Sequence, residues 1–305
     1  MKKNTDDKAS LTFAMQLSLW TGLVMLVIKM GAFYLTGSAA ILSDAAESVV
    51  HIAAVVFAAY SLKLSYKEPD EEHLYGHTKI SFFSAGFEGA MIVIAAFYII
   101  YEAVSKWIAG LYLENLGTGT ALTGFAALLN GFLGFYLLQK GKKNNSIILE
   151  ANGKHVLTDS WTSLGVLAGL ALTLLTGWLP WDPIFAILVA INILYSGFGL
   201  IKRSVSGLMD AADPKIHKKI IEILEKETKS YGILFHNVLH RNLGNLLWVD
   251  LHLLFPQNTS IKEAHRVATI IETTIEKNLD QRSYVTSHLE SIEDHEEVHS
   301  DNIMH

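Results

Sequence analysis

Cysteine is absent from the 305-residue sequence, which excludes disulfides and thiolate metal sites. Any bound metal ion must then use histidine, aspartate or glutamate side chains. Basic residues are also scarce: 24 Lys and Arg against 30 Asp and Glu give a net charge of -6, so the sequence lacks the basic surface that favours nucleic acids. Apolar residues are abundant, at 50% of the chain, and the mean hydropathy is +0.30. These values are typical of a membrane protein.

Six apolar stretches are long enough for transmembrane helices, which need about 20 residues. They run over residues 13–35, 39–62, 82–104, 121–138, 147–175 and 180–200. Acidic residues precede the first stretch and no small-residue cleavage site follows it, so we expect a retained span and not a signal peptide. Lysines and arginines gather in alternate loops, which predicts that both termini are cytoplasmic. The short loops favour a bacterial inner membrane.

A different pattern begins after Lys202, where charged and apolar residues alternate. Asp213-Pro214 predicts the start of a helix that runs to about Tyr231, and a serine cap opens a second amphipathic helix over 260–279. Strands are expected over residues 233–243, 246–255 and 283–292. The predicted fold is an all-α membrane domain of six transmembrane helices followed by a cytoplasmic α+β domain of order αββαβ.

The sequence therefore predicts four regions. We assign residues 1–12 to a cytoplasmic N-terminal segment and 13–204 to the transmembrane domain. Residues 205–292 form the cytoplasmic domain, and residues 293–305 form a polar, histidine-containing tail that we expect to be disordered.

Two of the apolar stretches carry ionisable pairs, which are costly in a membrane and indicate function by default. Glu47 and His51 are four residues apart, and so are His155 and Asp159, so each pair shares one helix face. Two such helices packed together would bring two imidazoles and two carboxylates to one point. This set suits tetrahedral Zn²⁺, and it is also compatible with Cd²⁺, Co²⁺, Fe²⁺ and Mn²⁺. The alternative is that these residues pair only with each other, for structure.

Other polar residues inside the spans have no such pattern. Asp44 has no ionisable partner four residues away, and we expect it to be a structural or proton-accepting group. Lys29, Glu88 and Asn130 are expected to face neighbouring helices, and the sequence assigns them no role.

The parts outside the spans are rich in histidine. In the loop PDEEHLYGH, Asp70, His73 and His77 are spaced to hold a metal ion with water, or else the loop is merely acidic and solvated. Alternation along the strands predicts shared faces for three pairs, and a further histidine, His265, lies on the second helix. The pairs are His236 with His240, Asp250 with His252, and His288 with Glu290.

The segments GSAAILSDAAESVVH, EPDEEHLYGHTK and HVLTD, together with the αββαβ region, resemble the cation diffusion facilitators, which are divalent metal/proton antiporters. The resemblance implies six transmembrane helices, a metallochaperone-like cytoplasmic domain and a homodimer. It places the transport site on Glu47, His51, His155 and Asp159. The usual Asp-x-x-x-Asp or His-x-x-x-Asp pair is Glu-x-x-x-His here. The total of two nitrogens and two carboxylates still equals that of zinc-transporting members.

The same resemblance implies two cytoplasmic metal sites. One lies in the loop that holds Asp70, His73 and His77. The other is a binuclear site in the soluble domain, in which a glutamate replaces the usual bridging aspartate. Its matching residues are His236, His252, His265, His288 and Glu290.

We therefore expect a Zn²⁺/H⁺ antiporter that exports metal from the cytoplasm and regulates itself by binding Zn²⁺. Its partners would be membrane lipid, divalent metal ions, protons and a second copy of the chain. One alternative is an exporter of Fe²⁺, Mn²⁺ or Cd²⁺, and another is a membrane-bound metal sensor. An intramembrane metalloprotease is disfavoured because no H-E-x-x-H motif occurs, so we do not expect an enzyme.

Overall fold

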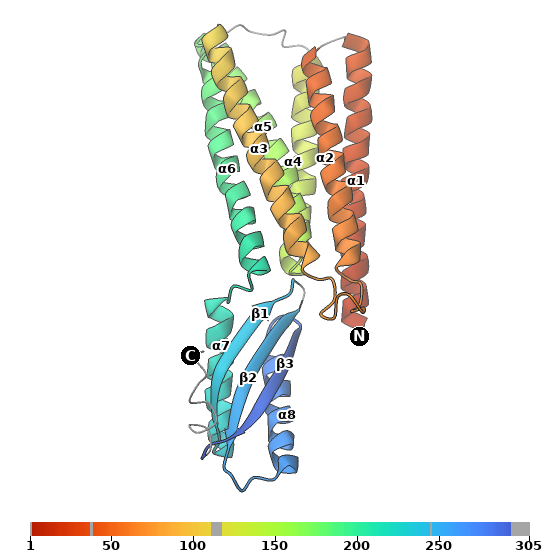
Figure 1. Ribbon diagram of the computed structural model, residues 1–305. Coiled ribbons are helices and arrows are strands. Elements are labelled where there is room, and N and C mark those ends of the chain that lie inside the picture. The colour runs from red at the N-terminus through yellow and green to blue at the C-terminus, as the bar shows by residue number, and fades with distance from the viewer. Residues whose placement is uncertain (1, 37–38, 111–117, 245, 294–305) are drawn as a thin grey trace. The chain divides into compact units, whose positions relative to one another are not determined.

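The computed structural model describes residues 2–36, 39–110, 118–244 and 246–293. The chain divides into two compact units, Met1–Val205 and Ser206–His305 (Figure 1). The predicted tail lies almost wholly outside the described residues, as does Asn245 in the turn between the first two strands. The side chains of Glu47 and His51 also lie outside the part of the chain that the structure describes.

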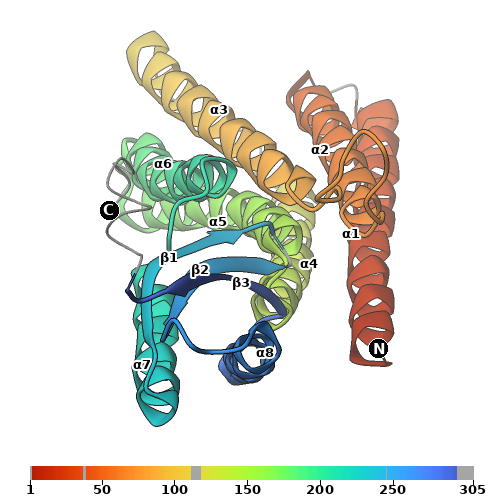
Figure 2. The same cartoon turned by 60° about the horizontal axis from the view of Figure 1, so that its bottom comes forward.

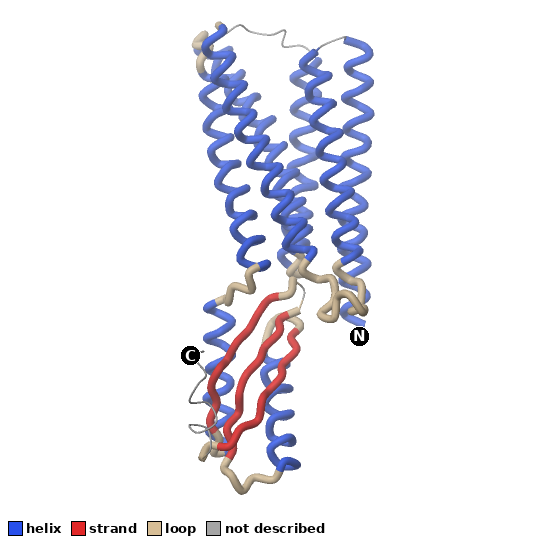
Figure 3. Tube along the Cα trace, viewed as in Figure 1, coloured by secondary structure: helices blue, strands red, loops and turns tan. Residues whose placement is uncertain are grey.

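The first unit is a bundle of long helices that run alongside one another (Figure 3). In chain order they are α1 (Lys2–Thr36), α2 (Ala39–Leu64), α3 (Ile80–Ala109), α4 (Thr118–Lys143), α5 (Ile147–Thr176) and α6 (Trp181–Leu208). Each has at least 26 residues, which is enough to cross the apolar core of a bilayer, about 30 Å. Among the described residues, three segments are both long and apolar enough to span a membrane: Ala9–Ile28, Ile80–Ala109 and Pro183–Leu208.

Helix α5 lies at the centre of the contacts in this unit, because it packs against α1, α2, α3 and α4. Its contact with α4 is the closest. A Cβ added at Gly153 would lie 2.6 Å from the backbone nitrogen of Leu138, so only glycine allows the two helices to approach this closely. Ser160 adds a hydrogen bond from its hydroxyl to the carbonyl oxygen of Ala127, at 2.8 Å. Because α5 also packs against α2, the predicted second and fifth spans are neighbours.

The second unit has the predicted order αββαβ. Its elements are α7 (Pro214–Tyr231), β1 (Leu234–Asn242), β2 (Leu247–Phe255), α8 (Ile261–Asn278) and β3 (Ser283–Ser291). Asp213 and Ser260 cap the two helices as expected, since each side chain accepts a hydrogen bond from a backbone N–H of the first turn. The sheet order is β1-β2-β3, with the first pair antiparallel and the second parallel. Both helices cover the same face of the sheet, as Figure 2 shows.

A β-bulge in β1 overturns one prediction. His236 pairs with His252 of β2, but Leu239 pairs with Asp250, so β1 contains one residue more than its partner over this stretch. Asn237 has a φ of 47°, in the left-handed region. The prediction that His236 and His240 share a face is therefore wrong, because the extra residue turns His240 toward the helices.

Candidate metal sites

The membrane unit holds a buried imidazole and a buried carboxylate in contact. Nδ1 of His155, on α5, lies 3.0 Å from Oε2 of Glu88, on α3. The exposed fraction of Glu88 is 1% and that of His155 is 9%. Asp159 follows His155 by one turn on the same face of α5 and is half-buried. Glu47 and His51, which complete the predicted quartet, belong to α2, which packs on α5.

Glu88 is the residue whose role the sequence did not predict. It has no partner at the four-residue spacing that marked the other pairs, so periodicity gave no sign of it. The available signal was its charge in an apolar span, where an ionisable side chain needs a partner or water. The partner, His155, is 67 positions later in the sequence, and only the packing of α3 on α5 brings the two together.

Other buried polar contacts fasten α5 to its neighbours. The hydroxyl of Ser18 on α1 donates to Oδ1 of Asn152 at 2.8 Å, and both side chains are buried. At the start of α5, the carboxylate of Glu150 accepts two hydrogen bonds from the guanidinium of Arg203 on α6. These contacts hold α5 in place at the turns that precede His155.

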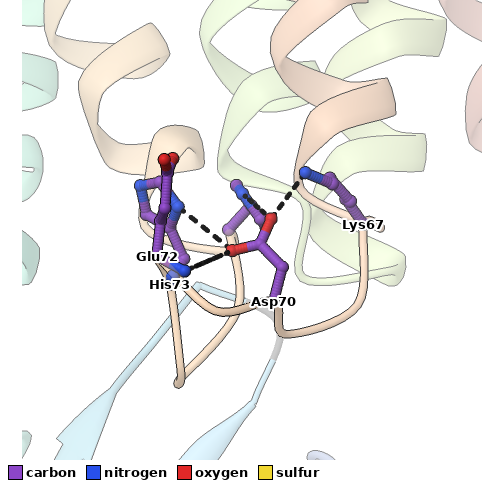
Figure 4. Close-up of polar contacts among 5 residues, drawn as sticks. Lys67, Asp70, Glu72 and His73 are labelled. Atoms are coloured by element: carbon purple, nitrogen blue, oxygen red, sulfur yellow. Dashed lines mark hydrogen bonds and ion pairs between the residues drawn. The ribbon is translucent and has the colours of Figure 1, made fainter.

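The loop before α3 brings its three predicted ligands together. One ligating atom each of Asp70, His73 and His77 lies within 4.8 Å of the others. Oδ1 of Asp70 accepts hydrogen bonds from the backbone N–H groups of Glu72 and His73, and Oδ2 accepts one from Nζ of Lys67 at 2.6 Å (Figure 4). The Lys67 hydrogen bond holds the pKa of Asp70 well below its ordinary value. The carboxylate therefore stays ionised, as a metal ligand must, while the lysine competes for it.

Gly76 shapes this loop. Its φ is 79°, and its N–H donates to the carbonyl oxygen of His73 at 2.8 Å, which closes a turn. Glycine takes that conformation without strain. The turn brings the rings of His73 and His77 together, with centroids 4.4 Å apart.

The soluble unit forms a second cluster on the open face of its sheet. Ligating atoms of His236, His252 and Glu290 lie within 4.8 Å of one another. Glu290 Oε2 is 2.8 Å from Nε2 of His236, and its Oε1 is 2.6 Å from Nδ1 of His252. A proton or a metal ion has to lie between such atoms, since each offers a lone pair. Burial lowers the pKa of His252; Glu290 opposes this shift, and the neighbouring imidazoles add to it. The neutral, ligating form of His252 is therefore favoured.

The two remaining predicted ligands of this domain, His265 and His288, lie at different places relative to the cluster, and Asp250 shares a strand with His252. His288 borders the cluster, with Nε2 3.8 Å from Glu290 Oε1 and its ring centroid 5.1 Å from that of His252. His265 lies on the exposed side of α8, the helix that covers the opposite face of the sheet. Asp250 is already bound to other side chains, because it accepts hydrogen bonds from Trp248 and Thr286.

His240 and His217 form a separate pair on the helix side of the sheet. Their rings are stacked with centroids 5.5 Å apart, and only 8% of His240 is exposed. Burial lowers the pKa of His240, and the neighbouring His217 lowers it further, whereas Asp213 opposes the shift. The uncharged form of His240 is therefore favoured near neutral pH.

Comparison with known proteins identifies the family. Residues 15–209 match the cation efflux transmembrane domain, and residues 212–292 match the cytoplasmic domain of cation efflux proteins. An uncharacterized transporter of Synechocystis is 37% identical over 278 residues, which cover 91% of this chain and 89% of the relative. The zinc transporter ZitB of Yersinia pestis is 32% identical over 235 residues, or 76% of this chain and 73% of the relative. An uncharacterized transporter of Methanocaldococcus jannaschii is 29% identical over 275 residues, or 88% of this chain and 95% of the relative. The predicted family is thus confirmed, and the chain belongs to the cation efflux proteins, integral membrane transporters of divalent metal ions.

Proposed function

We propose that this protein is a Zn²⁺/H⁺ antiporter that removes zinc from the cytoplasm as a homodimer in a bacterial inner membrane. The observation that carries the proposal is the buried contact between His155 and Glu88 inside the membrane unit, with Asp159 one turn away. Burying an ionisable group inside a membrane span costs free energy, so its presence there indicates a functional role. The similarity to a zinc transporter supports zinc as the cargo.

The transport site in this proposal consists of Glu47 and His51 on α2 and His155 and Asp159 on α5. These four side chains must lose protons to bind the ion, so zinc loading releases protons. Protons that arrive from the other side then displace zinc. Imidazoles suit this exchange because they change charge near neutral pH. The two nitrogens favour zinc over harder ions such as Mn²⁺.

The cytoplasmic clusters would bind zinc without transporting it. His236, His252 and Glu290 supply nitrogen and oxygen donors that already converge, and His288 borders them. The loop residues Asp70, His73 and His77 also supply nitrogen and oxygen donors that lie close together. Zinc held by the soluble domains would favour one arrangement of the dimer. That arrangement would in turn shift the population of the membrane units toward one conformational state. Both termini and the soluble domain face the cytoplasm in this proposal.

The test is metal uptake into proteoliposomes that contain the purified protein and a pH gradient. Zinc/proton exchange predicts zinc accumulation that stops when an ionophore collapses the gradient, together with proton movement in the opposite direction. A metal sensor would bind zinc and accumulate none. An exporter of Fe²⁺, Mn²⁺ or Cd²⁺ would accumulate that ion in preference to zinc when the ions compete.

A further inference from the structure

Glu88 occupies an unusual position for an acidic residue. It lies on α3, inside the segment Ile80–Ala109 that is long and apolar enough to span a membrane. Its side chain is 1% exposed, and its carboxylate oxygen lies at ion-pair distance, 3.0 Å, from Nδ1 of His155, although the ring N–H is not aligned for a hydrogen bond. An ionisable group at such a place costs several kcal/mol unless it is compensated, so a structural role alone would be served better by an apolar residue.

The packing of α3 fixes the direction of this side chain. At the next residue, Gly89, an added Cβ would lie 3.0 Å from Cβ of Leu200 and 3.1 Å from the carbonyl oxygen of Gly197, both on α6. The backbones of α3 and α6 are therefore in close contact at this turn. Since α3 also packs on α5, Glu88 is held between two fixed helices with its carboxylate against His155.

The chemistry of the contact concerns the imidazole tautomer. A neutral imidazole carries its hydrogen on one ring nitrogen and offers a lone pair on the other. An ionised carboxylate only accepts, so it favours the hydrogen on the nearer nitrogen, which is Nδ1. The lone pair then lies on Nε2, and carboxylates that act on metal-bound histidines in this way orient the ring and raise its basicity.

We propose that Glu88 is a positioning residue of the transport site, which keeps the ring hydrogen of His155 on Nδ1 and leaves Nε2 to bind the transported ion. The inference rests on the proposed function, because it takes His155 as a ligand of that ion. It assigns a part in transport to α3, in addition to α2 and α5.

Zinc uptake by two substitutions separates positioning from other roles. Glu88→Leu removes the acceptor and is expected to raise the zinc concentration for half-maximal uptake by about 10- to 100-fold, with a smaller effect on the maximal rate. Glu88→Gln keeps an acceptor oxygen, so its effect should be several times smaller. Glu102→Leu is the matched control, since it makes the same change on the same helix about 21 Å along the axis, and uptake should stay at the parental level. Unaltered uptake by Glu88→Leu would overturn the proposal. Equal damage by Gln and Leu would also overturn it, because the carboxylate would then act as a ligand.

A spectroscopic measurement tests the tautomer without transport. In zinc-free, ¹⁵N-histidine-labelled protein above neutral pH, the His155 signals, assigned by their loss in His155→Gln, should report hydrogen on Nδ1. Glu88→Leu should move that hydrogen toward Nε2, whereas Glu88→Gln should leave it in place. Hydrogen on Nε2 in the parent protein contradicts the inference. Unchanged helix content by circular dichroism shows that each variant is folded.

The two proposals fail in different ways. If His155→Ala transports zinc like the parent, the proposed transport site is wrong, and the tautomer measurement still decides whether Glu88 sets the ring. If His155→Ala is inactive while Glu88→Leu is unaffected in uptake and tautomer, the transport site stands and the role of Glu88 is refuted.

Discussion

Glu290 of β3 and His236 of β1 lie 2.8 Å apart, from Oε2 to Nε2, although β2 runs between their strands. The other oxygen of this carboxylate contacts His252 on β2 itself, so one side chain touches residues of both other strands. Only 6% of the Glu290 side chain is exposed. The carboxylate is therefore the centre of the cluster on the open face of the sheet.

We expect Glu290→Gln to reduce the zinc bound per chain by at least one ion at limiting zinc. The amide loses the negative charge that offsets the ion, and one of its two polar atoms is a donor. Elemental analysis of purified protein after equilibrium dialysis measures the stoichiometry. Glu222→Gln, on the exposed side of α7, is the control and should bind as much zinc as the parent. If Glu290→Gln binds as much zinc as the parent, the Glu290 carboxylate is not a zinc ligand.

The double variant His252→Ala with His288→Ala should lose zinc as well, but it should lower transport less than the membrane substitutions do.

His155→Ala and Asp159→Ala are each expected to abolish zinc-driven proton movement in proteoliposomes, to below about one hundredth of the parental rate. A tetrahedral site that loses one ligand loses affinity and also a group that exchanges a proton. A pH-sensitive dye trapped in the vesicles measures the flux, and Glu102→Gln serves as the control within a span. Near-parental flux at limiting zinc for either variant would exclude that residue as a ligand.

His51→Asp should keep transport but change its selectivity. The proposed site would then contain one nitrogen and three carboxylates, which favours harder ions such as Mn²⁺ or Fe²⁺ over Zn²⁺. The pH midpoint should move to lower pH, because carboxyl groups lose protons at lower pH than imidazoles. Competition of zinc against manganese over a pH series measures both effects. If neither the ranking of the metals nor the midpoint changes, His51 is not a ligand.

Lys67→Gln should strengthen zinc binding in the loop by up to about fivefold. The ammonium group of Lys67 competes with a metal ion for the carboxylate of Asp70, so its removal frees one oxygen. Asp70→Asn should have the opposite effect and weaken binding. Zinc titration with a competing chelator measures the affinity, and Lys63→Gln is the control because this exposed lysine lies one helical turn earlier. Weaker binding in Lys67→Gln would mean that the lysine supports the site.

The ring of His240 should titrate below the ordinary histidine value of about 6.5. Burial disfavours its charged form, and His217→Gln should raise the pKa because a neighbouring positive charge is removed. A base with a depressed pKa binds fewer protons when folded. Its contribution therefore destabilises the soluble domain as the pH falls below about 6.5 toward the folded-state pKa. An NMR titration of labelled histidines, assigned with His240→Gln, measures these values. A midpoint at or above 6.5 would contradict the assignment.

The local pattern of the chain was enough to predict the secondary structure of the soluble domain. The strands and helices lie within two residues of the predicted bounds, because alternation, helical periodicity and the caps at Asp213 and Ser260 are properties of neighbouring residues. The same local geometry placed His155 and Asp159 on one face of a helix. It also indicated the candidate loop residues Asp70, His73 and His77, which lie within eight residues of one another and come together in the structure.

Tertiary structure decided which elements meet. Nothing near Glu88 in the sequence indicates His155, since their contact depends on how α3 packs against α5. Nor does alternation along β1 reveal the bulge that separates His236 from His240, because the bulge depends on the backbone conformation of one residue, Asn237. Sequence periodicity determines which side chains share a face of one helix or strand. Distances between elements depend instead on how the whole bundle or sheet packs. That packing also determines which partner each buried charge meets.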